Sequence, residues 1–198
     1  MAHSWERGAA MALSSKFTYY SDFVVYPVAI AALVGVNSRH VTLHDGETWL
    51  VACLGGLVLW TLLEYLIHRI ALHRMPIFSP MHSLHHGAPL AYIATPSWIS
   101  VSVWLGVIML PLWWYAGFNF ADGITVGLMT GYWWYGWVHH VIHHHARKPT
   151  SAYFGELRAW HMRHHHSPRR GNFGVTTHLW DRVFGTVISS RAEAVLQS

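Results

Sequence analysis

Cysteine and charged residues are scarce in this sequence. Only one cysteine, Cys53, occurs among the 198 residues, and Asp, Glu, Lys and Arg together make up 11% of the chain. A single cysteine excludes a disulfide framework and a cysteine-ligated metal site. The net charge of +4 is not gathered into the basic patches of nucleic-acid-binding proteins, which excludes nucleic acid as a partner. Residues 1–15 lack an apolar core followed by a cleavage site, so no signal peptide is expected.

Apolar residues are abundant instead, at 53% of the chain, and many lie in long runs. Four runs reach the roughly 20 residues with which a helix crosses a bilayer. They are residues 17–36, 48–67, 97–116 and 119–138. Only Gly117 and Phe118 separate the last two runs, which predicts a helical hairpin with the aromatic residues 113–115 at the membrane interface. Pro111 is expected to kink the third run.

The fourth run has small residues at a regular spacing. Gly123, Gly127 and Gly131 recur every four residues, which places them on one side of a helix. This pattern predicts close packing against a neighbouring helix. The fold class predicted from these runs is all-α, an integral membrane helical bundle of about four transmembrane helices with a histidine-rich helical cap.

The basic residues predict the orientation of these spans. With both termini on one side, that side receives every lysine and arginine except Arg39, and such an excess marks the cytoplasmic face. The whole chain, 1–198, is expected to form a single membrane domain. Its parts would be a cytoplasmic tail at 1–16, four spans within 17–138 that include a cytoplasmic loop at 68–96, and a cytoplasmic cap at 139–198.

Histidine is the most informative residue type, with 18 copies in the chain. Ten of them fall into two sets with the same order, an open pair followed by a compact H-x2-H-H. The sets are His68, His73, His82, His85 and His86, then His139, His143, His161, His164 and His165. Imidazole is the commonest protein metal ligand, and ten are too many for one tetrahedral zinc. The pattern therefore predicts a site for two metal ions at the cytoplasmic boundary of the membrane.

Helical spacing predicts which histidines cooperate. Residues three and four apart share a helix face, so each H-x2-H-H can aim several nitrogens at one point. His68 and His73 are five apart, and they converge only if the helix bulges between them, unless each addresses a different metal. The run from Val138 to His145 offers either His139 with His143 or His140 with His144. His145, His166 and His178 are expected to have other roles.

An all-imidazole site suits iron, zinc, copper or nickel. Attack on a lipid C–H bond needs dioxygen and a redox metal, which favours iron. Carboxylates normally orient such histidines, and the candidates are Glu64, Glu156 and Asp181. Each of the three could equally be a surface or capping residue.

Several motifs together resemble the fatty acid hydroxylase superfamily, from about Gly55 to Thr186. They are LEYLIHRIALH (63–73), HSLHHGAP (82–89), HHVIHH (139–144), HMRHH (161–165) and NFGVTTHLWDRVFGT (172–186). The resemblance selects the His139 frame, because Tyr135 precedes that motif as in similar proteins. It implies that the ten histidines named above are the metal ligands. Gly136 departs from the acidic residue that fatty acid 2-hydroxylases tend to have there, which leaves the substrate open.

The resemblance implies a non-haem di-iron monooxygenase. Two iron ions, replaceable by zinc on purification, would use O2 and two external electrons to hydroxylate a lipid, with a fatty acyl chain as the expected substrate. The electron donor would be a separate ferredoxin- or cytochrome b5-like protein, and the expected location is a bacterial inner membrane. The alternatives are a sterol or carotenoid hydroxylase or desaturase with the same metal centre, and a membrane metal transporter or metal-binding protein.

Overall fold

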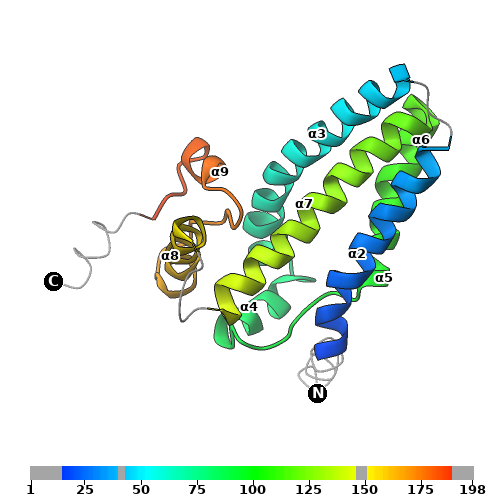
Figure 1. Cartoon of the computed structure of the whole chain (residues 1–198). Helices are drawn as coiled ribbons and strands as arrows, with labels where there is room; N and C mark the ends of the chain where they lie inside the picture. Colours follow the sequence, from blue (N-terminus) through cyan, green and yellow to red (C-terminus); the bar gives the residue numbers. More distant parts are fainter. Residues whose placement is uncertain (1–14, 40–42, 146–150, 189–198) are drawn as a thin grey trace. The chain divides into compact units, whose positions relative to one another are not determined.

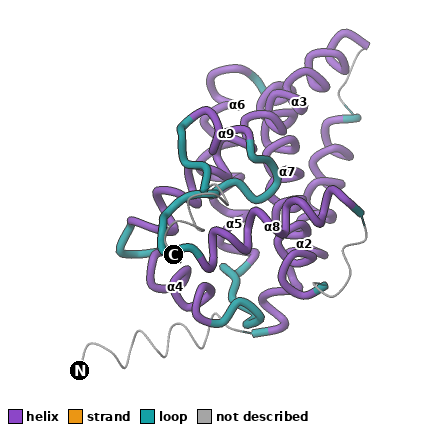
Figure 2. Tube along the Cα trace, turned by 90° about the vertical axis from the view of Figure 1, so that its left-hand side faces the viewer, coloured by secondary structure: helices purple, strands orange, loops and turns teal. Residues whose placement is uncertain are grey.

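The computed structural model describes residues 15–39, 43–145 and 151–188. Within these ranges every regular element is a helix, as Figures 1 and 2 show, which confirms the predicted all-α class. Arg7, Arg147, Lys148 and Arg191, which are among the basic residues assigned to the cytoplasmic side, lie outside the described residues.

The chain divides into two compact units. Unit 1 comprises Met1–Trp60 and Ala91–Trp134, and unit 2 comprises Thr61–Leu90 and Tyr135–Ser198. Two long helices contribute residues to both units, because α3 spans Leu43–Leu66 and α7 spans Phe118–His144. All ten candidate metal ligands belong to unit 2.

Unit 1 contains the long apolar helices. Besides its parts of α3 and α7, it is built from α2 (Lys16–Asn37), α5 (Ser97–Val103), η2 (Trp104–Met109) and α6 (Leu110–Ala116). Three stretches of the described chain are long and apolar enough to cross a membrane. These are Lys16–Asn37, Asp45–Leu72 and Ser97–Ala116, which agree with the first three predicted spans. The fourth predicted span, 119–138, lies within the 27-residue α7 (Phe118–His144), which is not among these membrane-capable stretches of the described chain.

The hairpin and the irregular third span occur where the sequence places them. Gly117 has a positive φ of 83° and separates α6 from α7. The third span changes to π-helix at η2, directly before Pro111, and there the amide of Leu110 donates to the carbonyl of Leu105. This wider turn lies where the proline removes a backbone donor. Trp114 and Tyr115 are 85% and 86% exposed, as side chains that face a membrane interface would be.

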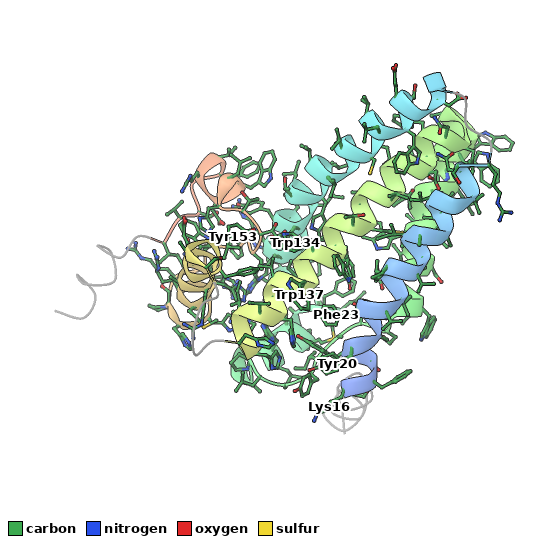
Figure 3. The ribbon with its side chains drawn as sticks, viewed as in Figure 1. Lys16, Tyr20, Phe23, Trp134, Trp137 and Tyr153 are labelled. Carbon is green, nitrogen blue, oxygen red and sulfur yellow. The ribbon has the colours of Figure 1, made fainter. Side chains whose placement is uncertain are left out.

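Aromatic residues also gather near the start of α2. Lys16, Tyr20 and Phe23 lie along this part of the helix in Figure 3. The Tyr20 and Tyr92 rings lie 5.6 Å apart, and the Lys16 ammonium is 5.4 Å from the centre of the Tyr92 ring. Aromatic and lysine side chains at the end of a span are typical of interfacial anchoring.

The glycine face of α7 packs directly on α3 within unit 1. A methyl group added at Gly127 would lie 2.1 Å from the Cys53 carbonyl oxygen, and one at Gly131 would lie 2.4 Å from the Trp60 ring. Gly56 of α3 meets the backbone of α7 in the same way, with the Ile124 carbonyl oxygen 2.4 Å from an added methyl. The predicted close packing at the glycines is therefore confirmed.

Unit 2 consists of shorter helices together with the last turns of α3 and α7. It contains η1 (Ile67–Leu72), α4 (Ser79–Gly87), α8 (Ala152–His166) and α9 (Leu179–Val183). One apolar core cluster of this unit consists of Val138, Ile142, Leu157 and Val175, with Tyr135, Phe154 and Met162 packed against it. This core joins the end of α7 to α8 and to the loop before α9, which are the segments that carry the second half of the histidines.

Replacing Gly127 with alanine should destabilise the protein, because the added methyl group has no space beside the Cys53 carbonyl. We expect a loss of about 1–3 kcal/mol in the free energy of unfolding. Gly136→Ala is the matched control in the same helix, since nothing lies within 4 Å of its added methyl. Thermal unfolding in detergent measures both, and equal stability of the two variants would contradict the packing described for α7.

Candidate metal centre

The π-helical segment η1 solves the spacing problem of the first histidine pair. Its hydrogen bonds join residues five apart, so that residues at this spacing come to one side of the helix. His68 and His73 are five apart, and their ring centres lie 5.2 Å from each other. Of the two possibilities that the spacing left open, the structure shows the bulged helix with both rings in one group.

The first group of histidines contains His68, His73, His82, His86 and His164, whose available nitrogens all lie within 4.8 Å of one another. Four Nε2 atoms form a closed ring. His73 lies 3.1 Å from both His82 and His164, while His86 lies 3.0 Å from His82 and 3.1 Å from His164. The fifth, His68, lies 3.1 Å from His82.

These separations suit the ligands of a single metal ion. A flat square with 3.1 Å sides has its centre about 2.2 Å from each corner, close to the usual metal–imidazole distance of about 2.0–2.1 Å.

The positions of the ring protons also suit a metal ion. The Nδ1 of His68 donates to the Phe173 carbonyl at 2.5 Å, and that of His164 donates to the Gly171 carbonyl at 2.8 Å. A neutral ring that donates through Nδ1 carries its lone pair on Nε2, so these lone pairs face one another and a cation fits between them.

The second group contains His85, His139, His143, His161 and His165, again with all available nitrogens within 4.8 Å. The Nε2 of His161 lies 3.0 Å from the Nε2 atoms of both His143 and His165. The Nε2 of His85 is buried and has no hydrogen-bond partner among the described residues. An orphaned buried nitrogen is costly unless something else binds it, and a metal ion would do so.

The two groups adjoin. The rings of His86 and His165, one from each group, stack with their centres 4.2 Å apart and their planes 20° from parallel. His85 and His86 are consecutive residues that belong to different groups. The arrangement can therefore hold a pair of neighbouring metal ions.

The groups do not follow the order of the sequence. His85 joins the second group and His164 joins the first, so each H-x2-H-H motif divides between the two. His82 and His86 stay together, as do His161 and His165, because residues four apart share a helix face. Each compact motif thus aims two of its three histidines at one point, and the residue at the third step belongs to the other group.

Burial keeps these imidazoles neutral. Desolvation, reinforced by the neighbouring rings, lowers the pKa of His73 and His85 to about 4 and that of His143 and His164 to about 3. The same causes lower the pKa of His82, His86, His139, His161 and His165. Metal binding requires the unprotonated ring, so the groups are ready to bind at neutral pH.

A short loop, 171–177, orients the histidines from behind. Gly171 and Phe173 supply the carbonyl oxygens that accept from His164 and His68. Asn172 between them has a positive φ of 53°, and its side chain donates to the Trp160 carbonyl at 3.2 Å and accepts from the Ile188 amide at 2.8 Å. Figure 2 shows this segment as loop.

Two buried carboxylates hold this loop in place. Asp181 accepts from the amides of Phe173 at 2.9 Å and Gly174 at 2.8 Å. Glu64 accepts from the amides of Val175 at 2.6 Å and Thr176 at 2.8 Å, and also from the Thr176 hydroxyl. Both residues therefore support the imidazoles through the backbone rather than by direct contact.

Glu156, the third expected carboxylate, has a different place. It is 69% exposed and lies 3.3 Å from the Nδ1 of His178, whose ring stacks on Trp160 at 4.0 Å. His178 belongs to neither metal group, and neither do His140, His144, His145 or His166. The rings of His140 and His144 stack on each other at 4.8 Å.

Sequence reasoning missed the carbonyl oxygens of Gly171 and Phe173. A backbone acceptor leaves no residue-type signature, so only indirect signals pointed to it. The Gly-Asn pair at 171–172 was one such signal, because asparagine and glycine are the residues that most readily adopt positive φ. The other was the acidic residue of the WD pair, Asp181, which proves to bind the loop.

Comparison with known proteins agrees with this geometry. The sequence model of the family described as fatty acid hydroxylase matches residues 53–186. The chain belongs to the fatty acid hydroxylase family. This confirms the resemblance drawn from the histidine motifs, and the family is one of hydroxylating oxidoreductases.

Individual relatives of this family member come from yeast, animals and plants. It is 34% identical to the ceramide very long chain fatty acid hydroxylase scs7 of Schizosaccharomyces pombe, over 66% of this chain and 40% of the relative. It is 32% identical to rat fatty acid 2-hydroxylase, over 72% of this chain and 41% of the relative. With the dihydroceramide fatty acyl 2-hydroxylase FAH2 of Arabidopsis thaliana it shares 29% identity, over 89% of this chain and 74% of the relative. The match thus spans about two fifths of the first two relatives.

A solved structure has the same fold as this hydroxylase-family chain. It is described as full-length scs7p with only the hydroxylase domain visible. The two agree with a TM-score of 0.71 at 22% identity, over 90% of this chain and 69% of the other. At this identity the likeness shows the fold alone.

Single histidine replacements should remove metal from one group at a time. We expect His164→Ala to weaken binding in the first group and His85→Ala to weaken it in the second, the reverse of what their positions in the sequence predict. His145→Ala is the control, because His145 is exposed and belongs to neither group. Metal analysis and spectroscopy of purified variants measure this, and full metal content in both test variants would refute the grouping.

Asp181→Asn should loosen the loop behind the histidines. Both carboxylate oxygens of Asp181 accept a backbone hydrogen bond, whereas the asparagine amide has only one acceptor atom, its oxygen. We expect a loss of about 1–3 kcal/mol in stability and about a 10–100-fold loss in metal affinity. Glu156→Gln is the matched control at an exposed carboxylate. Metal titration and thermal unfolding measure these two losses. A metal affinity and a thermal stability that are both unchanged in Asp181→Asn would reject the supporting role.

Proposed function

We propose that this protein is a membrane-bound non-haem di-iron monooxygenase that hydroxylates a fatty acyl chain. The observation that carries the proposal is the pair of adjoining five-histidine groups, in which buried or half-buried neutral imidazoles direct their lone pairs at common points. Nitrogen ligands alone do not distinguish iron from zinc. Iron is favoured because insertion of oxygen into an unactivated C–H bond needs a redox metal, and zinc does not change its oxidation state.

The reaction proposed is a two-electron oxygenation. One atom of O2 enters the C–H bond to give a hydroxyl group, and the other leaves as water after taking up two electrons and two protons. Bound iron would supply the activation of O2. The protein's own contribution would be to hold the imidazoles neutral and oriented, through the carbonyl oxygens of Gly171 and Phe173 and the carboxylates behind them.

The proposed substrate reaches the site from the membrane. His68 lies one turn beyond Glu64, near the end of the apolar stretch Asp45–Leu72, so an acyl chain in the bilayer would approach the first histidine group at this end. The bias of basic residues supports a cytoplasmic position for this end. A separate ferredoxin- or cytochrome b5-like protein would deliver the electrons.

The names of the relatives support the acyl chain over other lipids. They are called fatty acid 2-hydroxylase, dihydroceramide fatty acyl 2-hydroxylase and ceramide very long chain fatty acid hydroxylase. We extend this to the present chain as hydroxylation at carbon 2 of a free or amide-linked fatty acyl group.

The proposal is tested by lipid mass spectrometry on cells that express the protein under 18O2. We expect 2-hydroxy fatty acyl species that contain one 18O atom, and their loss in the His143→Ala variant with the protein still present in the membrane. Labelled sterols or carotenoids without labelled acyl chains would instead support the alternative lipid substrates and reject the acyl proposal. In vitro, ferrous iron with a reductant should restore turnover to metal-free protein, while zinc should not.

A further inference from the structure

The last short helix of unit 2 has an exposed apolar edge that the metal centre does not explain. Leu179, Val183, Phe184 and Val187 are 50%, 59%, 46% and 43% exposed, and we call these four residues the α9 edge. Four neighbouring apolar side chains that project from one short segment are unfavourable in water. Such a patch marks a surface that is normally covered.

The edge results from how α9 is held. Leu179 and Val183 are four residues apart and share one face of the helix, whereas Asp181 points to the opposite side and is fully buried. The buried side is tied to the protein through the contacts of Asp181 with Phe173 and Gly174. The apolar face is therefore held outward by hydrogen bonds on the other face.

The position of α9 indicates what covers this edge. The Trp180 indole donates to the Thr61 hydroxyl at 3.0 Å, and the Phe184 ring stacks on Tyr65 with ring centres 5.3 Å apart and planes 11° from parallel. Thr61 and Tyr65 belong to the membrane-capable stretch Asp45–Leu72. Figure 1 shows α9 beside these turns of α3.

The length of that stretch places α9 at the edge of the bilayer. A helix crosses the hydrocarbon core with about 20 residues, so a crossing that begins near Asp45 ends near Tyr65. The residues that α9 contacts therefore lie in the last turns inside the membrane. Side chains that project from α9 at this level meet lipid rather than bulk water.

Basic residues flank the α9 edge in the manner of an interfacial helix. Arg182 is exposed on α9 itself, and the guanidinium of Arg69, one turn beyond Tyr65, donates to the Tyr65 hydroxyl at 2.7 Å. Arginines beside an apolar face suit the phosphate groups of the lipid surface.

We propose that the α9 edge inserts into the lipid interface as a second membrane attachment, separate from the transmembrane helices, with Arg182 and Arg69 at the phosphate level. The covering partner is the lipid bilayer. Because Asp181 on the same helix holds the 171–177 loop, this attachment fixes the loop behind His68 and His164 at the membrane surface. The proposal needs only a membrane-embedded chain, so it stands apart from the enzymatic activity.

Spin-label accessibility in liposomes tests this directly. The full chain, with Cys53→Ser to remove the native thiol, is labelled at Val183→Cys or Val187→Cys and reconstituted into phosphatidylcholine–phosphatidylglycerol vesicles without paramagnetic metal. Power saturation then compares collisions with O2, which concentrates in lipid, and with chromium oxalate, which stays in water. Val58→Cys, at a 67% exposed position within α3, is the lipid control, and Ala152→Cys, exposed on α8, is the water control.

We expect labels at 183 and 187 to fall between the two controls, with a lower ratio of O2 to chromium oxalate accessibility than at Val58 and a severalfold higher ratio than at Ala152. Their depth should be about 5–10 Å below the phosphates, as for interfacial helices. Accessibility to chromium oxalate equal to that at Ala152 would overturn the proposal. Protection from both reagents would also overturn it, since a protein partner or a second copy would then cover the edge.

Discussion

Neutral imidazole lone pairs that face one another are the constraint on which the rest of unit 2 depends. Two groups of five buried or half-buried rings contain nitrogen–nitrogen distances near 3 Å, which are unfavourable for like dipoles unless a cation lies between them. Around this centre, several hydrogen bonds keep the lone pairs oriented toward one another. Carbonyl oxygens hold the protons of His68 and His164 on the outer nitrogens, and buried carboxylates hold the backbone that carries those carbonyls.

His85 belongs to the group that is otherwise formed by later histidines, and His164 to the group that is otherwise formed by earlier ones, which makes the two groups interdependent. The first group is complete only when η1, α4 and α8 are together, because it draws on all three. The second group joins α4 and α8 to the end of α7. Metal binding in either group would therefore stabilise the association of α4 with α8, which couples binding to the folding of unit 2.

Much of this architecture could be predicted from the sequence, because hydrophobic length and histidine spacing are local properties. Three long apolar runs, the Gly117 turn, the glycine face of α7 and the family all agree with the structure. The bulged helix at His68 was predicted only as one of two alternatives. The five-residue spacing shows that His68 and His73 cannot share a face of a regular α-helix, but it does not show whether the helix bulges or each residue binds a different metal. The division of each H-x2-H-H motif was not foreseen, because it depends on which helices lie on either side. The roles of Gly171 and Phe173 were also hidden, since any residue type can supply a carbonyl oxygen.

Anomalous X-ray diffraction at the iron edge, from crystals of the iron-loaded protein, tests the central claim most directly. The account predicts two separate anomalous peaks, one surrounded by His68, His73, His82, His86 and His164 and the other by His85, His139, His143, His161 and His165. The nitrogens should lie at about 2.0–2.2 Å from each peak. A single peak, or peaks outside these groups, would contradict it.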